Sequence, residues 1–201
     1  MSNKEIFDRI AAQYDTPDRA HVAKLIAEAI GKELEHSETK SAIDYGCGTG
    51  LVGLELLDRF QSVLFVDASP AMVEVLQSKL AQRGISKAKA DVLCSDFALE
   101  DPGVKADYIL LSQVLLHVKD YGSLLERLYS MLNSAGHLII VDFDKNPSID
   151  SDMVHNGFDQ AALIELLKEI GFRAAAAKTF YHGEKIFMGQ DASLFLLDGQ
   201  K

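Results

Sequence analysis

Four segments of the chain place an acidic or amide side chain where an apolar run ends. Asp44 lies in SAIDYGCGTG, Asp67 closes SVLFVD, Asp96 follows ADVLC, and Gln113 follows the run that begins with DYILL. Carboxylate and amide oxygens accept hydrogen bonds from hydroxyls and amines. A carboxylate withdrawn from water also needs a cation or a donor beside it. These residues could therefore hold a polar ligand if the ends of the four runs meet.

The glycine turn after Asp44 is the feature around which the chain is organised. Gly46, Gly48 and Gly50 permit positive φ angles and let a ligand approach the backbone, because no Cβ stands in the way. The free N–H groups of the helix that follows face the same space. A strand, a glycine turn and a helix start together make a nucleotide-sized cradle. Any tight strand-to-helix turn can collect glycines, so the later strands must decide whether the cradle is a site.

Hydrophobic periodicity indicates the elements that position these residues. Expected helices cover about residues 4–14, 17–31, 51–60, 70–84, 121–132 and 159–170. Expected strands cover about residues 42–45, 62–67, 90–94, 107–111, 137–143, 174–181 and 192–197. The last two strands are joined by a turn region over 183–189, which leaves no room for a crossover helix, so they should be antiparallel.

This alternation predicts an α/β fold with a Rossmann-like, doubly wound, mostly parallel seven-stranded sheet. A C-terminal antiparallel hairpin strand completes the sheet, and helices cover both faces. In such sheets ligands bind beyond the carboxyl ends of the strands.

Composition favours one cytoplasmic domain that acts on small molecules. The 201 residues carry a formal net charge of −10, which would repel a nucleic acid backbone. Cys47 and Cys94 lie far apart and lack zinc-site spacing, so no metal is expected. The charged N-terminus has no apolar signal core, and no run is long enough for membrane insertion. The short loop Asp144–Gly157 also favours a small-molecule substrate. The protein is expected to be a monomer or a homodimer.

The motif DYGCGTG resembles that of class I S-adenosylmethionine-dependent methyltransferases, in particular the small-molecule group that includes the ubiquinone/menaquinone-biosynthesis enzymes. FDRIAAQYD resembles the lid helix that often precedes this motif, and the resemblance covers about residues 5–143. It implies one domain over 1–201, with a lid and first helices (1–36), a cofactor-binding core (37–143), and a substrate-side loop, last helix and hairpin (144–201).

The resemblance implies S-adenosyl-L-methionine as cofactor and S-adenosyl-L-homocysteine as product. Asp44 would lie near the amino end of the methionine, Asp67 would hold the ribose hydroxyls, and Asp96 would meet the adenine amino group. The implied cofactor-binding residues are Asp44, Tyr45, Gly46, Cys47, Gly48, Gly50, Asp67, Ala68, Met72, Ser95, Asp96, Phe97, Ser112 and Gln113. Structural alternatives stay open: Asp44 could bond only to backbone, Asp67 could cap a helix, Asp96 could be a turn residue, and Met72 could belong to the core.

Methyl transfer to a small molecule by in-line displacement requires mainly orientation and exclusion of water. His117, just after the fourth strand, and Tyr14, in the lid, are the candidate catalytic residues, while His155 and His182 are weaker candidates. Whether a general base is needed depends on the pKa of the acceptor.

Other classes of function fit parts of the same sequence. Gly48–Gly53 matches G-x-G-x-x-G with Asp67 about 20 positions on, and Tyr181 with Lys185 matches the Y-x-x-x-K pair of NAD-dependent short-chain dehydrogenases. In that family the pair lies on a helix, whereas Tyr181 here ends an expected strand. A non-catalytic S-adenosylmethionine-binding protein and a subunit that works only in a complex are the remaining alternatives.

Overall fold

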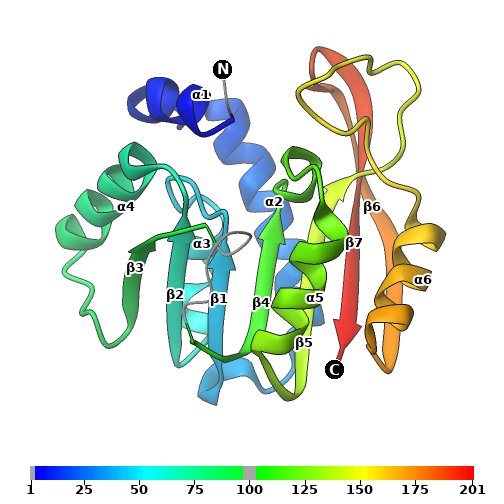
Figure 1. Ribbon diagram of the computed structural model, residues 1–201. Helices are drawn as coiled ribbons and strands as arrows, with labels where there is room; N and C mark the ends of the chain where they lie inside the picture. The colour runs from blue at the N-terminus through cyan, green and yellow to red at the C-terminus, as the bar shows by residue number, and fades with distance from the viewer. Residues whose placement is uncertain (1–2, 97–102) are drawn as a thin grey trace. The chain divides into compact units, whose positions relative to one another are not determined.

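The computed structural model describes residues 3–96 and 103–201, so Phe97 lies outside the described residues. The chain divides into two compact units, one ending at Pro102 and the other beginning at Gly103. The strands form a seven-stranded sheet in the order β3-β2-β1-β4-β5-β7-β6. This mixed sheet with its helices confirms the predicted fold class (Figure 1).

The first unit contains three parallel strands and the helices around them. Its elements are α1 (Asn3–Ile10), the short 3-10 turn η1 (Ala11–Gln13), α2 (Pro17–Glu33), η2 (Ser37–Thr39), β1 (Ser41–Tyr45), α3 (Gly53–Leu56), η3 (Leu57–Arg59), β2 (Ser62–Asp67), α4 (Pro70–Gln82) and β3 (Ala90–Cys94). β2 pairs in parallel with both β1 and β3, which puts the ends of all three strands on one edge.

Local signals fix where α2 and α4 begin. Thr16 and Ser69 are the N-cap residues, and their side chains accept hydrogen bonds from the backbone N–H groups of Arg19 and Met72. In each case a proline occupies the first helical turn, where its missing N–H costs nothing. Both helices therefore begin where the sequence predicts.

The helix after the glycine turn is shorter than predicted. Instead of a helix over 51–60, α3 spans four residues and η3 follows it. The Gly50 N–H donates to the Cys47 carbonyl oxygen within the tight turn, and the first helical bond, from Leu54 N–H to Gly50 O, follows it, so α3 begins only at Gly53. Phe60 then takes an extended conformation that leads into β2 and is buried in the core.

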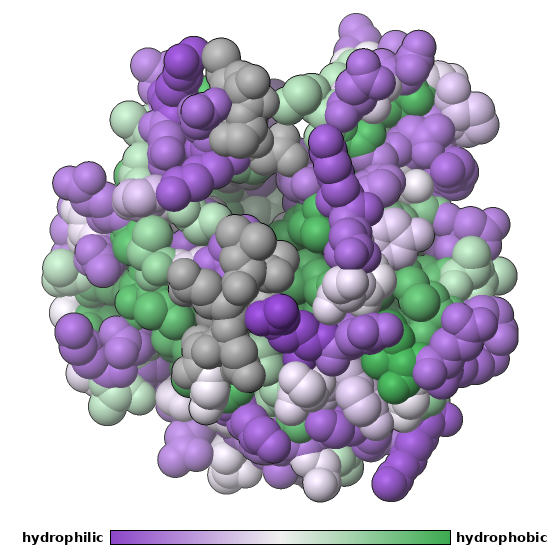
Figure 2. Space-filling model, in the orientation of Figure 1, coloured by the Kyte–Doolittle hydropathy of each residue, from purple (hydrophilic) through white to green (hydrophobic). Residues whose placement is uncertain are grey.

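The second unit holds the other four strands. Its elements are β4 (Ala106–Ser112), η4 (Leu115–His117), α5 (Tyr121–Met131), β5 (Leu132–Phe143), α6 (Gln160–Ile170), β6 (Ala174–Phe187) and β7 (Gln190–Gln200). β4 and β5 are parallel, and β7 runs antiparallel to both β5 and β6. In the space-filling view, hydrophilic residues cover the outward side of α6 and hydrophobic residues gather where it meets α5 (Figure 2).

The terminal hairpin is much longer than the predicted strands over 174–181 and 192–197. Gly183 was expected in the turn, but it is buried inside β6, where a register shift between Gly183 and Phe187 accommodates it. The turn lies instead at Met188 and Gly189, both with positive φ. β5 also begins at Leu132 instead of residue 137, because Leu132 already pairs with Ala106.

Candidate functional site

The glycine turn is fastened to the end of β2. The backbone N–H groups of Gly46 and Cys47 both donate to the carbonyl oxygen of Val66, at 2.8 and 3.0 Å. Gly46, Gly48 and Gly50 have φ angles of 69°, 54° and 82°, a region that L-residues with side chains rarely adopt. The sequence therefore needs glycine at these three positions to make the turn.

Asp67 joins the turn to the start of α4. One carboxylate oxygen accepts a hydrogen bond from the Gly48 N–H at 2.7 Å, and the other accepts one from the Ser69 N–H at 2.8 Å. Burial raises the pKa of Asp67, and these backbone donors partly offset that rise. The helix cap of α4 is Ser69 and not Asp67, which instead links the glycine turn to the residue that caps the helix.

Asp44 is buried beneath the turn. Its side chain is 2% exposed and its Oδ2 atom has no hydrogen-bond partner. Burial, and secondarily the charge of Asp67, raises the pKa of Asp44 to about 7, while the Gly53 N–H opposes the shift. A Cβ on Gly53 would collide with Oδ2 of Asp44 and lie 2.5 Å from Cε1 of Phe65, which explains the glycine at position 53.

Gly48 and Gly50 have different surroundings. A Cβ on Gly50 would lie 2.5 Å from Cδ1 of Leu76, so this glycine lets α4 pack closely against the turn. A Cβ on Gly48 would meet nothing nearer than Cε1 of Tyr14, at 4.0 Å. The space over Gly48 is therefore open and is bordered by the Tyr14 ring.

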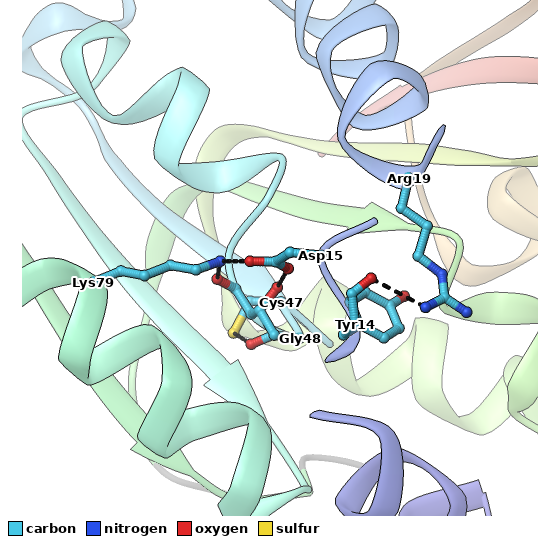
Figure 3. A network of polar contacts seen from close by, with 7 residues as sticks. Tyr14, Asp15, Arg19, Cys47, Gly48 and Lys79 are labelled. Atoms are coloured by element: carbon cyan, nitrogen blue, oxygen red, sulfur yellow. Dashed lines mark hydrogen bonds and ion pairs between the residues drawn. The ribbon is translucent and has the colours of Figure 1, made fainter. Parts of the chain in front are cut away.

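Residues 3–16, which we call the N-terminal strap, are tied to the turn through Asp15. Figure 3 shows the Asp15 carboxylate beside the turn and facing Lys79: the Thr49 hydroxyl donates to Oδ1 of Asp15 at 2.5 Å, and the Lys79 ammonium pairs with Oδ2. Lys79 also donates to the Thr49 carbonyl oxygen at 2.7 Å. Asp15 and Lys79 therefore hold the strap against the residues that follow Gly48.

Two further contacts position the strap. Asp8 accepts a hydrogen bond from the Ser69 hydroxyl at 2.6 Å. The Arg19 guanidinium lies over the Tyr14 ring at 4.3 Å and donates to the Tyr14 carbonyl oxygen. Burial raises the pKa of the Tyr14 phenol, so this side chain stays protonated at neutral pH. The contact between Asp8 and Ser69 was not predicted, because the two residues are 61 positions apart and leave no local pattern.

The end of β3 comes next to the end of β2. The Tyr45 hydroxyl donates to Oδ1 of Asp96 at 3.0 Å, and the Ser95 N–H donates to the Asp67 carbonyl oxygen at 3.0 Å. Asp96 is therefore held by a side chain from β1. Its carboxylate follows β3 on the same edge as Asp67.

The other predicted residues of the first unit lie close to these. Cys47 is held as a neutral thiol, because burial and the charges of Asp44 and Asp67 raise its pKa. Met72 is 1% exposed and belongs to the core, and Ala68 links Asp67 to the cap of α4.

Ser112, Gln113 and His117 belong to the second unit. Ser112 ends β4, and Gln113 follows it with a φ of 54° and donates its N–H to the Val141 carbonyl oxygen at 2.7 Å. Burial lowers the pKa of His117 to about 4, so its ring is neutral at physiological pH. Asp142 accepts the Leu116 N–H within the turn that carries His117.

The weaker histidine candidates have structural partners. His155 donates through Nε2 to the Val118 carbonyl oxygen at 2.9 Å, and His182 contacts the Ser193 hydroxyl across the hairpin. Within residues 3–96 and 103–201, no group of three or more His, Cys, Asp or Glu residues could hold a metal ion. No helix among the same residues is long and apolar enough to span a membrane.

Comparison with known families now adds to this geometry. The sequence model described as "Methyltransferase domain" matches residues 18–177, which is most of the chain. The chain belongs to this family. The match includes the whole glycine turn, Asp67 and the end of β3.

Individual relatives of this methyltransferase-domain protein are distant. An uncharacterized methyltransferase of Schizosaccharomyces pombe is 23% identical over 210 residues, covering 79% of this chain and 74% of its own. A ubiquinone biosynthesis O-methyltransferase of Azorhizobium caulinodans is 31% identical over 98 residues, covering 49% of this chain and 38% of its own. The crystal structure of an S-adenosylmethionine-dependent methyltransferase from Aquifex aeolicus has a TM-score of 0.70 at 18% identity, with 96% and 97% of the two chains covered.

The dehydrogenase alternative is wrong. Tyr181 and Lys185 both lie on β6, so they do not have the helical placement that the Y-x-x-x-K pair requires. The family match to a methyltransferase domain agrees with this finding.

Proposed function

We propose that this methyltransferase-domain protein transfers the methyl group of S-adenosylmethionine to a small-molecule acceptor. The observation that carries the proposal is the carboxylate of Asp67, fixed at the end of β2 by the N–H groups of Gly48 and Ser69. Each carboxylate oxygen can accept more than one hydrogen bond, so both retain capacity for ligand hydroxyls. The open space over Gly48 lies next to this carboxylate.

The residues present fit a positively charged nucleoside ligand. Within the described part of the chain, neither Asp44 nor Asp67 forms an ion pair with a lysine or arginine, and Oδ2 of Asp44 has no hydrogen-bond partner. Buried carboxylates without a cation are costly. Ammonium and sulfonium groups on a ligand would offset that cost.

Each predicted cofactor-binding residue in the described part of the chain takes a role in the proposal. Asp67 binds the ribose hydroxyls, and the carboxylate of Asp44 attracts the ammonium group at the amino end of the methionine. Asp96 with Ser95 faces the adenine. The remaining residues contact the cofactor or support the residues that contact it: Tyr45, Gly46, Cys47, Gly48, Gly50, Ala68, Met72, Ser112 and Gln113. Met72 would contribute from the core side only, because its side chain is buried.

The cofactor supplies an electrophilic methyl group, and the protein binds, orients and shields the reactants. The Tyr14 phenol is protonated and borders the space over Gly48, so it excludes water there. His117, the other candidate, is a weak base with a pKa of about 4. We assign it hydrogen bonding to the acceptor, which favours an acceptor atom that needs no strong base. We further propose that the protein is cytoplasmic, that it is a monomer or a homodimer, and that it has no nucleic acid partner.

Cofactor binding is tested first. Mass spectrometry of the purified protein should detect retained S-adenosylmethionine or its product, and calorimetry should give the affinity. Asp67→Ala should weaken binding at least about tenfold, because the carboxylate that accepts from Gly48 N–H, Ser69 N–H and the ribose hydroxyls is removed. Asp67→Asn keeps one acceptor oxygen and should lie between, while Asp58→Asn, at an exposed site on η3, serves as the control. Unchanged affinity in Asp67→Ala would exclude Asp67 from the site.

Turnover is tested separately. Transfer of a labelled methyl group to members of a small-molecule panel would establish the enzyme. Binding without transfer to any member would favour the non-catalytic alternative.

A further inference from the structure

A buried carboxyl group in the second unit has no role in the methyl transfer proposed above. Asp142 lies near the end of β5 and is 0% exposed. The strand register puts Leu111 of β4 and Phe195 and Leu197 of β7 on the same face of the sheet, and all three are buried. A carboxyl group in apolar surroundings is costly unless hydrogen-bond donors meet it.

Backbone donors meet the Asp142 carboxyl group. Oδ1 accepts the Phe143 N–H at 2.8 Å, and Oδ2 accepts the Leu116 N–H at 3.2 Å. The Leu115 N–H also donates to this carboxyl group. An ionised carboxylate is an acceptor only, so it suits all three donors. A protonated carboxyl group or an amide would instead place a hydrogen of its own among them.

Two of these three donors belong to η4, the turn that ends at His117. The backbone before η4 is fixed to the same end of β5, because the Gln113 N–H donates to the Val141 carbonyl oxygen at 2.7 Å. Residues 112–117, which we call the His117 turn, contain three of the predicted site residues. β5 therefore positions the His117 turn through one carbonyl oxygen and one carboxyl group.

Burial, and not a charged neighbour, sets the protonation of Asp142. The strand register puts Asp107 of β4 and Asp191 of β7 on the same face as Asp142, while η4 and the start of α5 carry His117 and Tyr121. None of these four groups contributes to the pKa of Asp142, which burial raises to about 7 and the backbone donors lower.

We propose that Asp142 is a positioning residue of the methyl-transfer site, whose ionised carboxylate fixes the His117 turn against β5 and whose protonation loosens it. On protonation the new hydrogen competes with the backbone donors, so at least one N–H group of the turn loses its acceptor. The turn is therefore fixed more firmly as pH rises through neutrality. Its service to methyl transfer rests on the proposed function, whereas the fixing of the turn does not.

An NMR titration of the full-length chain without cofactor, from about pH 5.5 to about pH 8.5, tests the fixing of the turn. The Asp142 Cγ, the Leu116 amide and the His117 ring should all shift with one midpoint near pH 7. The His117 ring, with a pKa of about 4, does not itself titrate in this range. Its step therefore reports the position of the turn, which a side chain that only stabilised the fold would not move.

Asp44→Asn separates the two carboxyl groups, because the pKa of Asp44 is also about 7. The steps at Leu116 and His117 should persist in Asp44→Asn and disappear in Asp142→Asn. Asp150→Asn, at an exposed site, is the matched control and should follow wild type. Absence of the steps in wild type, their loss in Asp44→Asn or their persistence in Asp142→Asn would overturn the proposal. Wild type and Asp44→Asn decide the question even if Asp142→Asn does not fold.

Calorimetry with S-adenosylhomocysteine tests the service to the site. At pH 8, the double variant Asp44→Asn/Asp142→Asn should bind about two- to fivefold more weakly than Asp44→Asn, because the turn has lost a hydrogen-bond acceptor. At pH 6 the difference should shrink, since Asp142 is then protonated in Asp44→Asn as well. Equal affinities at pH 8 would overturn the positioning role. Absence of binding by wild type would instead overturn the proposed function, and the NMR steps would still decide whether Asp142 fixes the turn.

Discussion

Replacing Asp44 by asparagine should make the ligand-free protein more stable at alkaline pH. The pKa of Asp44 is raised from 3.8 to about 7, mainly by burial, so ionisation of this carboxyl disfavours the folded state. A pKa raised above the unfolded value means that the folded state binds more protons. Stability from this group is then lost as pH rises from about 4 to about 7.

The structure sets the size of the effect. A shift of about 3 pKa units corresponds to at most about 4 kcal/mol at 1.36 kcal/mol per unit. The new amide leaves a buried polar group without a partner, which costs about 1–3 kcal/mol. Asp44→Asn should therefore raise the free energy of unfolding by about 1–3 kcal/mol at pH 8, or several degrees in Tm. Below pH 4 this gain should disappear and leave only the cost of the amide.

Denaturant unfolding of wild type and Asp44→Asn at pH 4, 6 and 8 measures this difference. Asp58→Asn, exposed on η3, is the matched control and should follow wild type. Burial also raises the pKa of Asp142 to about 7. Part of the pH dependence of the free energy of unfolding therefore remains in every variant. If Asp44→Asn is no more stable than wild type at pH 8, the carboxyl is not a buried, uncompensated charge. In the proposed function the same variant should bind S-adenosylmethionine more weakly, because a charge that favours the cation is gone.

Two other predictions concern the supports of the glycine turn. Gly53→Ala should destabilise the protein by about 1–3 kcal/mol, since the added Cβ meets Asp44 and Phe65; urea unfolding measures this, and an unchanged midpoint would contradict the close packing. Lys79→Met breaks the ion pair with Asp15 and should speed dissociation of S-adenosylmethionine about two- to fivefold with little change in Tm. Stopped-flow measurement at low and high salt tests it, and wild type should approach the variant as salt screens the pair.

Features set by neighbouring residues could be predicted from the sequence. The starts of α2 and α4 follow from Thr16-Pro17 and Ser69-Pro70, and the positions of β1 to β4 follow from apolar runs bounded by turns. The rule that parallel strands present their carboxyl ends at one edge also placed Asp67 beside the glycine turn, which the Gly48 contact confirms.

Features that depend on distant partners could not be predicted. Asp15 contacts Thr49 across 34 positions, and no local pattern marks either residue for the other. From its local sequence, Gly183 was expected to end the strand. The register shift that accommodates it in β6 depends on the opposite strand, β7, which the local sequence does not show. The sequence also gave no sign that the carboxylate of Asp44 lies against Gly53, because packing beneath the turn sets that position.

The placement of β7 has a consequence for synthesis of the second unit. β7 lies between β5 and β6 in the sheet, although it follows both in the chain (Figure 1). On the ribosome, β6 emerges before the strand that must separate it from β5, so its fourteen residues have no neighbouring strand until residues 190–200 are made. This delay exposes a long unpaired strand to wrong pairing, and β6 can join the sheet only after residues 190–200 have left the ribosome.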